Sequence, residues 1–110
     1  MVYYSNEERH QVLDSLTDDQ AKKVTWVLRL IERLEIVPIQ YFKKLTGTAD
    51  IWEVRIQAGR NDYRLLGFME SGNFVIITNA FAKKSQKTPS REIELAEQRK
   101  QDYLRRRQKR

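Results

Sequence analysis

Apolar side chains recur at helical spacing in the first third of the chain. From Thr17 to shortly before Pro38 the pattern predicts one helix, opened by a capping box in which Thr17 and Gln20 satisfy each other's backbone amides. Residues 5–16 predict a shorter helix ahead of it. The longer helix carries a continuous apolar stripe, typical of a helix packed on a core: Val24, Val27, Leu28, Ile31 and Leu34.

In the middle third the apolar period becomes two residues, which predicts strands. We expect strands over residues 51–57, 63–69 and 74–81, with residues 2–4 as a candidate edge strand. The 74–81 segment is apolar at nearly every position, which favours a central place in the sheet.

The last element is a basic helix. Thr88 as N-cap, followed by proline at the first helical position, predicts a helix over about 89–107. The fold class is therefore α+β, in a single domain over residues 1–110. We expect two N-terminal helices, an antiparallel and twisted sheet of three or four strands, and this C-terminal helix.

Composition excludes several kinds of chemistry. The 110 residues contain no cysteine and one histidine, His10, so disulfides, thiolate metal sites, cysteine nucleophiles and histidine pairs are ruled out. Acidic residues do not cluster at metal-ligand spacing, and we expect no metal or other cofactor. No apolar run is long enough to span a membrane, and the start lacks a signal-peptide pattern. The sequence predicts a cytoplasmic protein without a membrane partner.

The net charge of +6 has two sources. Residues 99–110 hold seven basic side chains and one acidic one, and residues 36–91 hold nine basic and four acidic. A charge run at a terminus is often only a solvated helix end. An excess of basic residues inside the folded part is a better indication of a face that binds polyanions.

Strand geometry gathers part of this charge on one face of the sheet. Glu53 and Arg55 are two residues apart and project from the same face, and Arg64 on the following antiparallel strand can reach it. Lysines follow the third strand: Lys83, Lys84 and Lys87. We expect these side chains to line one cationic groove that contains a single carboxylate. Tyr41 and Tyr63 are candidates for stacking on bases near it.

Each of these residues also has a purely structural interpretation. Glu53 and Arg55 can be a solvent-facing pair, the lysines an ordinary solvated loop, and Tyr63 a core aromatic. A slip of one residue in the register would reverse the two faces. The functional interpretation rests on the convergence of Arg55, Arg64 and the lysines.

Three sequence blocks, in this order and spacing, resemble the HigB branch of the RelE-type toxins. They are the residues 51–56 (IWEVRI), 63–66 (YRLL) and 81–89 (FAKKSQKTP), preceded by KKLTG at 43–47. The resemblance covers roughly residues 3–104. It implies a small basic ribonuclease of a bacterial toxin–antitoxin pair, which enters the ribosomal A site and cuts the message there. The implied partners are the ribosome, messenger RNA and an antitoxin with a helix-turn-helix domain. The resemblance implies that DNA is contacted only indirectly, through this antitoxin.

Carried over residue by residue, the basic active-site positions of that family fall on Arg55, Arg64 and the pair Lys83 and Lys84. One branch of the family has a lysine where this chain has Glu53, and a catalytic tyrosine in the last segment. Here no tyrosine lies between Lys83 and Tyr103. Glu53 is thus a candidate base or a group that orients Arg55.

The remaining basic and aromatic positions are predicted RNA contacts: Lys43, Lys44, Tyr63, Lys87, Arg91, Arg105 and Arg106. Cleavage without metal uses the 2′-hydroxyl as an internal nucleophile, and arginine forks suit the charge that develops on the phosphate oxygens. The competing hypothesis is a non-catalytic RNA- or ribosome-binding regulator of translation.

Overall fold

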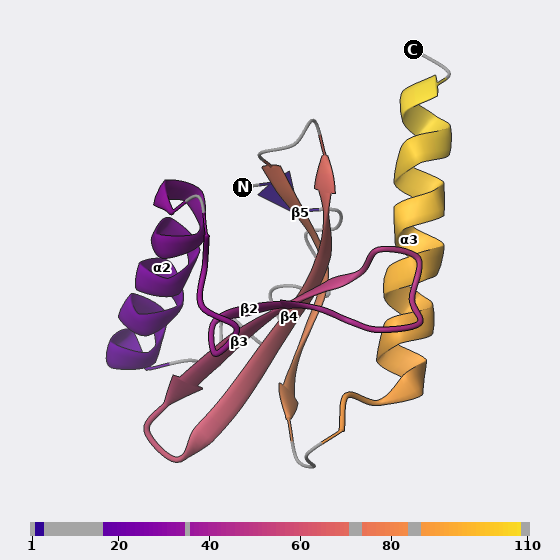
Figure 1. Cartoon of the computed structure of the whole chain (residues 1–110). Helices are drawn as coiled ribbons and strands as arrows, with labels where there is room; N and C mark the ends of the chain where they lie inside the picture. The colour runs from indigo at the N-terminus through magenta and orange to yellow at the C-terminus, as the bar shows by residue number, and fades with distance from the viewer. Residues whose placement is uncertain (1, 4–16, 35, 71–73, 84–86, 109–110) are drawn as a thin grey trace.

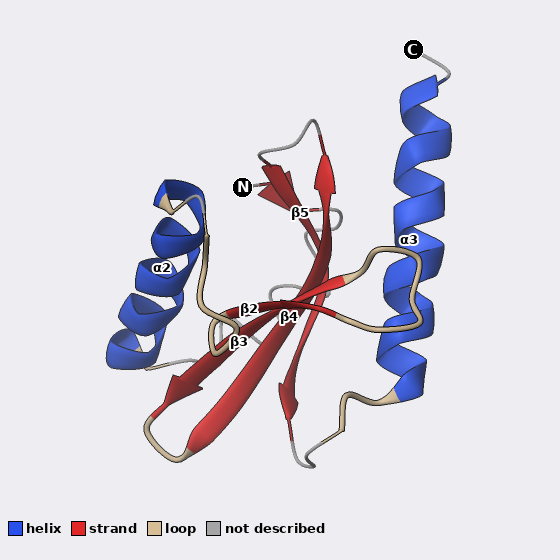
Figure 2. Ribbon diagram, viewed as in Figure 1, coloured by secondary structure: helices blue, strands red, loops and turns tan. Residues whose placement is uncertain are grey.

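The computed structural model describes residues 2–3, 17–34, 36–70, 74–83 and 87–108. A five-stranded sheet lies between α2 (Asp18–Arg33) on one face and α3 (Ser90–Gln108) on the other (Figures 1 and 2). The strands are β1 (Val2–Tyr3), β2 (Phe42–Lys44), β3 (Trp52–Ala58), β4 (Asn61–Glu70) and β5 (Phe74–Lys83). The α+β class is confirmed. The helix predicted over residues 5–16 lies outside the described residues.

The strand order is β1-β5-β4-β3-β2. Strands β2 to β5 are antiparallel neighbours, and β1 pairs in parallel with β5. The antiparallel part thus has four strands, within the predicted three or four, and the edge strand near residues 2–4 adds a fifth in parallel. The unpredicted strand, β2, has only three residues, too short for an alternating pattern to show. As predicted, β5 has a neighbour on both sides.

Helix α2 covers the first face of the sheet. Its predicted capping box is present, with the Gln20 amide donating to Thr17 Oγ1 at 3.2 Å and the Thr17 amide to Gln20 Oε1 at 3.0 Å. The stripe residues Val24, Val27 and Ile31 are buried against β3 and β4. Burial of each such side chain stabilises the fold by about 1.5–3 kcal/mol. Leu34, predicted in the stripe, is the C-cap and is 42% exposed because the helix ends at Arg33.

Helix α3 covers the second face through a smaller cluster of Ile51, Leu66 and Ala96. Arg99 of α3 is also buried, and its Nη1 donates a hydrogen bond to the Thr78 carbonyl of β5 at 2.6 Å. The Thr78 hydroxyl lies within hydrogen-bonding distance of two acceptors, the Leu66 carbonyl and Asn79 Oδ1, beside the irregular register at Leu66/Gly67. This buried polar network satisfies groups that burial alone would leave unpaired.

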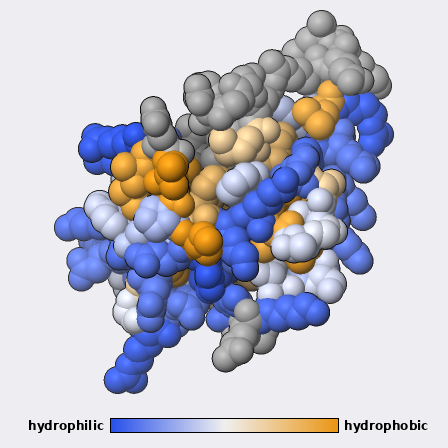
Figure 3. All heavy atoms as spheres, viewed as in Figure 1, coloured by the Kyte–Doolittle hydropathy of each residue, from blue (hydrophilic) through white to orange (hydrophobic). Residues whose placement is uncertain are grey.

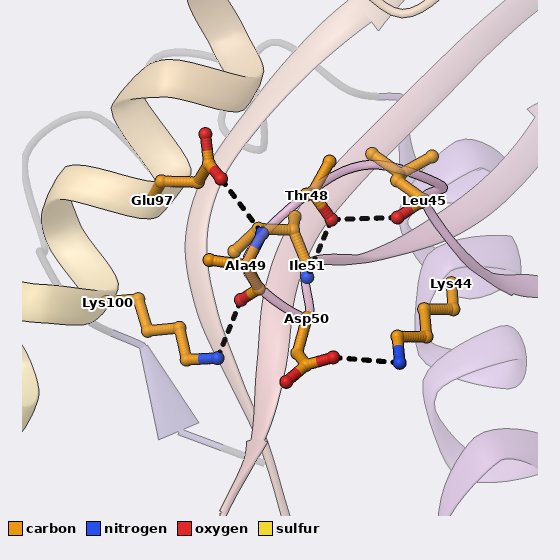
Figure 4. A network of polar contacts seen from close by, with 8 residues as sticks. All are labelled: Lys44, Leu45, Thr48, Ala49, Asp50, Ile51, Glu97 and Lys100. Carbon is orange, nitrogen blue, oxygen red and sulfur yellow. Dashed lines mark hydrogen bonds and ion pairs between the residues drawn. The ribbon is translucent and has the colours of Figure 1, made fainter.

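The segment between β2 and β3 crosses the sheet to α3 (Figure 1). Figure 4 shows how it is held: the Ala49 amide donates to Glu97 Oε2 at 2.9 Å, and Lys100 Nζ donates to the Ala49 carbonyl at 2.7 Å. Asp50 has φ of 55° and pairs with Lys44 Nζ at 2.8 Å. This pair holds the pKa of Asp50 below its ordinary value, through the hydrogen bond from Lys44 first. The two hydrogen bonds of Ala49 hold the segment between β2 and β3 against α3.

Figure 3 shows hydrophobic side chains gathered over the upper end of α2 and the segment that follows, where Leu34, Ile36 and Ile39 are exposed. Neither α2 nor α3, the helices within the described residues, contains a stretch apolar enough to cross a lipid bilayer.

Candidate functional site

Arg55 and Arg64 lie directly opposite each other on β3 and β4. Like charges at such a position repel, so the pair needs a compensating group. Glu53, two residues before Arg55, supplies it: Glu53 Oε1 lies 3.6 Å from Arg55 Nε and 3.5 Å from Arg64 Nε. All three side chains therefore share the face of the sheet that α3 covers, as the alternation predicted.

Glu53 is buried, and each of its oxygens has a partner. Oε1 faces the two guanidinium groups, and Oε2 accepts a hydrogen bond from Thr88 Oγ1, just before α3. A buried carboxylate needs such partners, because desolvation without them is costly. Thr88 was predicted as the N-cap of the last helix, but α3 begins at Ser90 and the Thr88 hydroxyl contacts Glu53 instead. This arrangement makes Glu53 a positioning group for the arginines.

Arg64 is the most constrained cation of the site. It is only 6% exposed, and its Nη1 donates to the Tyr63 carbonyl at 3.0 Å. Its Nε has no hydrogen-bond partner, since the distance to Glu53 is too long for a good hydrogen bond. Burial first, and then the charge of Arg55, lowers the pKa of Arg64, while Glu53 opposes the shift. A buried guanidinium with an unsatisfied N–H is a strong site for an anion.

Lys83 completes the cationic group from the end of β5. Lys83 on β5 pairs with Asp62 on β4. Two residues earlier on β5, Phe81 pairs with Arg64. Burial lowers the pKa of Lys83, and the positive charges of Arg64 and Arg55 lower it further. A lysine with a depressed pKa can exchange a proton near neutral pH more readily than an ordinary one.

An open pocket of about 290 Å³ lies in front of the arginines. Its lining comes from β3, β4 and the segment before β2: Gln40, Arg55, Ile56, Gln57, Asp62 and Arg64. Gln40, Gln57 and Asp62 were not among the predicted site residues. Strand alternation puts Gln57 on the face of Arg55, so this residue could have been found. Gln40 lies in a segment with no regular period.

The two tyrosines proposed to stack on bases were placed wrongly. Tyr63 is 8% exposed and belongs to the core under α2, on the opposite face from Arg64. Tyr41 packs against the same core and makes an edge-to-face contact with Trp26, with ring centroids 5.5 Å apart. The structural interpretation of Tyr63 is the correct one, because adjacent residues of a strand point to opposite faces.

The predicted lysine contacts differ in their positions. Lys43 is exposed and lies opposite Glu53 on β2, whereas Lys44 follows on the other face and pairs with Asp50. Lys87 is exposed shortly before α3. Lys84 lies outside the described residues.

The predicted arginine contacts lie along α3. Arg91 is exposed in its first turn, and Arg105 and Arg106 are exposed near its far end. At 1.5 Å rise per residue, Arg105 is roughly 20 Å along the helix from Arg91, so the tail is a separate basic surface. Arg106 also pairs with Asp102 one turn earlier.

Within the described residues, no three histidine, cysteine, aspartate or glutamate side chains lie together so that they could hold a metal ion. A small α+β protein with a partly buried cationic site on its sheet is the class that the fold and the site define.

Comparison with protein families identifies the chain further. The model of the phage-derived protein Gp49-like family (DUF891) matches residues 11–101, so the chain belongs to this family. The family belongs to the RelE/HigB-type toxins, is associated with RelE-like toxin ribonucleases and implies a cognate antitoxin partner. The match includes Glu53, Arg55, Arg64 and Lys83. A comparison with curated protein sequences gives no significant match.

Proposed function

We propose that this protein is a HigB-branch toxin of a type II toxin–antitoxin system, and that it cleaves messenger RNA in the ribosomal A site. The observation that carries the proposal is the pair of Arg55 and Arg64, held by buried Glu53, with the Arg64 Nε unsatisfied beside an open pocket. A phosphodiester supplies the oxygens that this pair lacks. The family membership supports the class of substrate.

The reaction that suits these groups needs no metal. The 2′-oxygen attacks the adjacent phosphorus and the bond from phosphorus to the 5′-oxygen breaks, leaving a 2′,3′-cyclic phosphate and a 5′-hydroxyl. Arg55 and Arg64 stabilise the charge on the non-bridging oxygens. Lys83, in its neutral form, accepts the proton of the 2′-hydroxyl, and Lys84 is the remaining sequence candidate for protonating the 5′-oxygen.

Glu53 in this scheme positions the arginines and does not act as the base, since both its oxygens are occupied. With a lysine as the base, we expect the free protein to have modest intrinsic activity. The ribosome then contributes by holding the message in a reactive geometry. Lys43, Lys87, Arg91 and the basic end of α3 are proposed phosphate contacts on RNA.

The decisive experiment maps the ends of a message in a purified translation system. We expect new ends in the coding region with the protein, and none with Arg64→Ala. Arg64→Lys should fail as well, because lysine keeps the charge but lacks the fork. Arg60→Ala is the matched control: an exposed arginine on the β3–β4 hairpin loop, where it should leave cleavage intact.

Further measurements control this experiment and test the competing hypothesis. Circular dichroism and thermal melting of Arg64→Ala show whether the loss comes from the site or from unfolding. Ribosomes that stall without new message ends would refute cleavage and favour the non-catalytic regulator. If a short reading frame next to the gene of this protein encodes the antitoxin, coexpression of the two proteins should abolish the growth inhibition caused by this protein alone.

A further inference from the structure

The pocket in front of the arginines has a second side that phosphate binding does not use. Next to the cations it is lined by Gln40, Gln57 and Asp62, all exposed. Within the described residues, none of these three side chains takes part in a hydrogen bond or ion pair. The two amides therefore have no side-chain partner there, and the Asp62 carboxylate, whose charge acts on Lys83 and Arg64, makes no hydrogen bond. All three groups can bind the ligand that the arginines hold.

The register fixes the spacing of the two sides. Arg55 pairs with Arg64, and two positions along the same strands Gln57 pairs with Asp62. Residues two apart in a strand share a face and are separated by roughly 7 Å. This separation is comparable with the reach from the phosphate of a nucleotide across its sugar to its base. A nucleotide whose phosphate lies on Arg64 would therefore present its base to Gln57 and Asp62.

The carboxylate limits which base fits. A carboxylate accepts two adjacent N–H donors best, and only guanine offers two, from N1 and the exocyclic N2. The Gln57 or Gln40 amide can then donate to guanine O6. Adenine and cytosine offer one amino group beside an acceptor nitrogen, which a carboxylate repels. Uracil offers a single N–H between two carbonyls.

Asp62 has one role within the sheet: it lies opposite Lys83 on β5, and its charge favours the protonated forms of Lys83 and Arg64. Asp62 lies in a pocket that is otherwise suited to phosphate, where a negative charge weakens the attraction for any RNA. Base recognition adds a second role for this carboxylate, because unpaired RNA bases are read by hydrogen bonds to their Watson–Crick edge. Resting on the proposed function, we propose that Gln40, Gln57 and Asp62 form a guanine-selective subsite for the nucleotide whose phosphate is bound by Arg55 and Arg64.

The first test uses the free protein and four probes, GMP, AMP, CMP and UMP, titrated separately and followed by NMR. We expect GMP to bind about tenfold more tightly than the others, the discrimination typical of one good bidentate contact. Asp62→Asn should abolish this preference, because its amide presents a donor to guanine N–H groups. Glu94→Gln, the loss of one exposed carboxylate on α3, should leave the preference unchanged.

Three outcomes would overturn the proposal. They are equal affinity for the four nucleotides, no binding of any of them, and an Asp62→Asn variant that binds all four more tightly by one common factor. The last result would mean that Asp62 acts only through its charge. Arg64→Ala should weaken all four alike, which separates phosphate binding from base reading.

The second test maps cleavage positions on the ribosome for the wild type and Asp62→Asn. We expect cuts of the wild type to concentrate beside one guanine position, and those of Asp62→Asn to spread over other bases. Cuts without any base preference would refute the subsite and leave the toxin proposal standing. Guanine-selective binding without any cleavage would refute the toxin proposal and leave the guanine subsite standing.

Discussion

Thr88 and Glu53, 35 residues apart in sequence, are joined by a buried hydrogen bond from the Thr88 hydroxyl to Glu53 Oε2. The bond connects the entry of α3 to the carboxylate that holds the two arginines. The position of α3 on the sheet and the geometry of the cationic site are thus determined together. A change at Thr88 should act on both.

Thr88→Val tests this connection, because it keeps the shape of the side chain and removes the donor. The buried carboxylate loses a hydrogen bond, and we expect a fall of about 1–3 kcal/mol in the free energy of unfolding. Urea denaturation measures it. Thr25→Val is the control, since the Thr25 hydroxyl donates to the Ala21 carbonyl on an exposed helix surface. Equal losses for the two variants would mean that Thr88 contributes nothing special.

The coupling of Glu53 and Arg64 predicts non-additive stabilities. Glu53→Gln leaves two guanidinium groups facing each other without compensation, and Arg64→Gln leaves a buried carboxylate with one cation fewer. We expect each single variant to lose about 3 kcal/mol or more. The double variant should lose clearly less than the sum, because neither charge is then unpaired. Strict additivity in denaturant titrations would show that the 3.5 Å contact carries no coupling.

The alternation of apolar and polar positions was sufficient to predict β3, β4 and the shared face of Glu53, Arg55 and Arg64. The same alternation places Tyr63 on the other face, since it is adjacent to Arg64, so the error on that tyrosine was avoidable. Gln40 was not predictable, because it reaches the pocket from an irregular segment whose path depends on tertiary packing. The contact of Thr88 with Glu53 was hidden for the same reason: local capping patterns give no information about a partner 35 residues away.

The β3–β4 hairpin depends on a glycine with a positive φ. Strand pairing of Ala58 with Asn61 leaves a two-residue loop, and Gly59 in it has φ of 65°. No neighbouring atom would meet a Cβ there, so the cost of Gly59→Ala is conformational only. We expect a loss of about 1–2 kcal/mol in stability.

The hairpin also sets the register of Arg55 against Arg64. Gly59→Ala should therefore perturb the amide chemical shifts of β3 and β4 more than Arg60→Ala in the same loop, whose stability should change by about 0.5 kcal/mol or less. If both variants melt at the temperature of the wild type, the positive φ is not a constraint in solution.

Lys83 should release its proton at lower pH than an ordinary lysine. Burial disfavours its charged form, and Arg64 and Arg55 add repulsion, so the folded-state pKa lies below the unfolded one. Between these two pKa values the unfolded chain binds more protons, and stability rises with pH in that window. Titration of the Lys83 Nζ by NMR checks the direction. Arg64→Gln should move the Lys83 pKa part of the way back up, because burial, the larger cause, remains.

The same shift predicts the pH profile of cleavage. If neutral Lys83 accepts the 2′-hydroxyl proton, the single-turnover rate rises with pH and levels off near the Lys83 pKa measured by NMR. Lys83→Arg, which stays protonated, should remove the rising limb and not merely lower the rate. Lys22→Arg, an exposed lysine on α2, is the matched control. A rising limb that survives in Lys83→Arg would assign the proton transfer to another group.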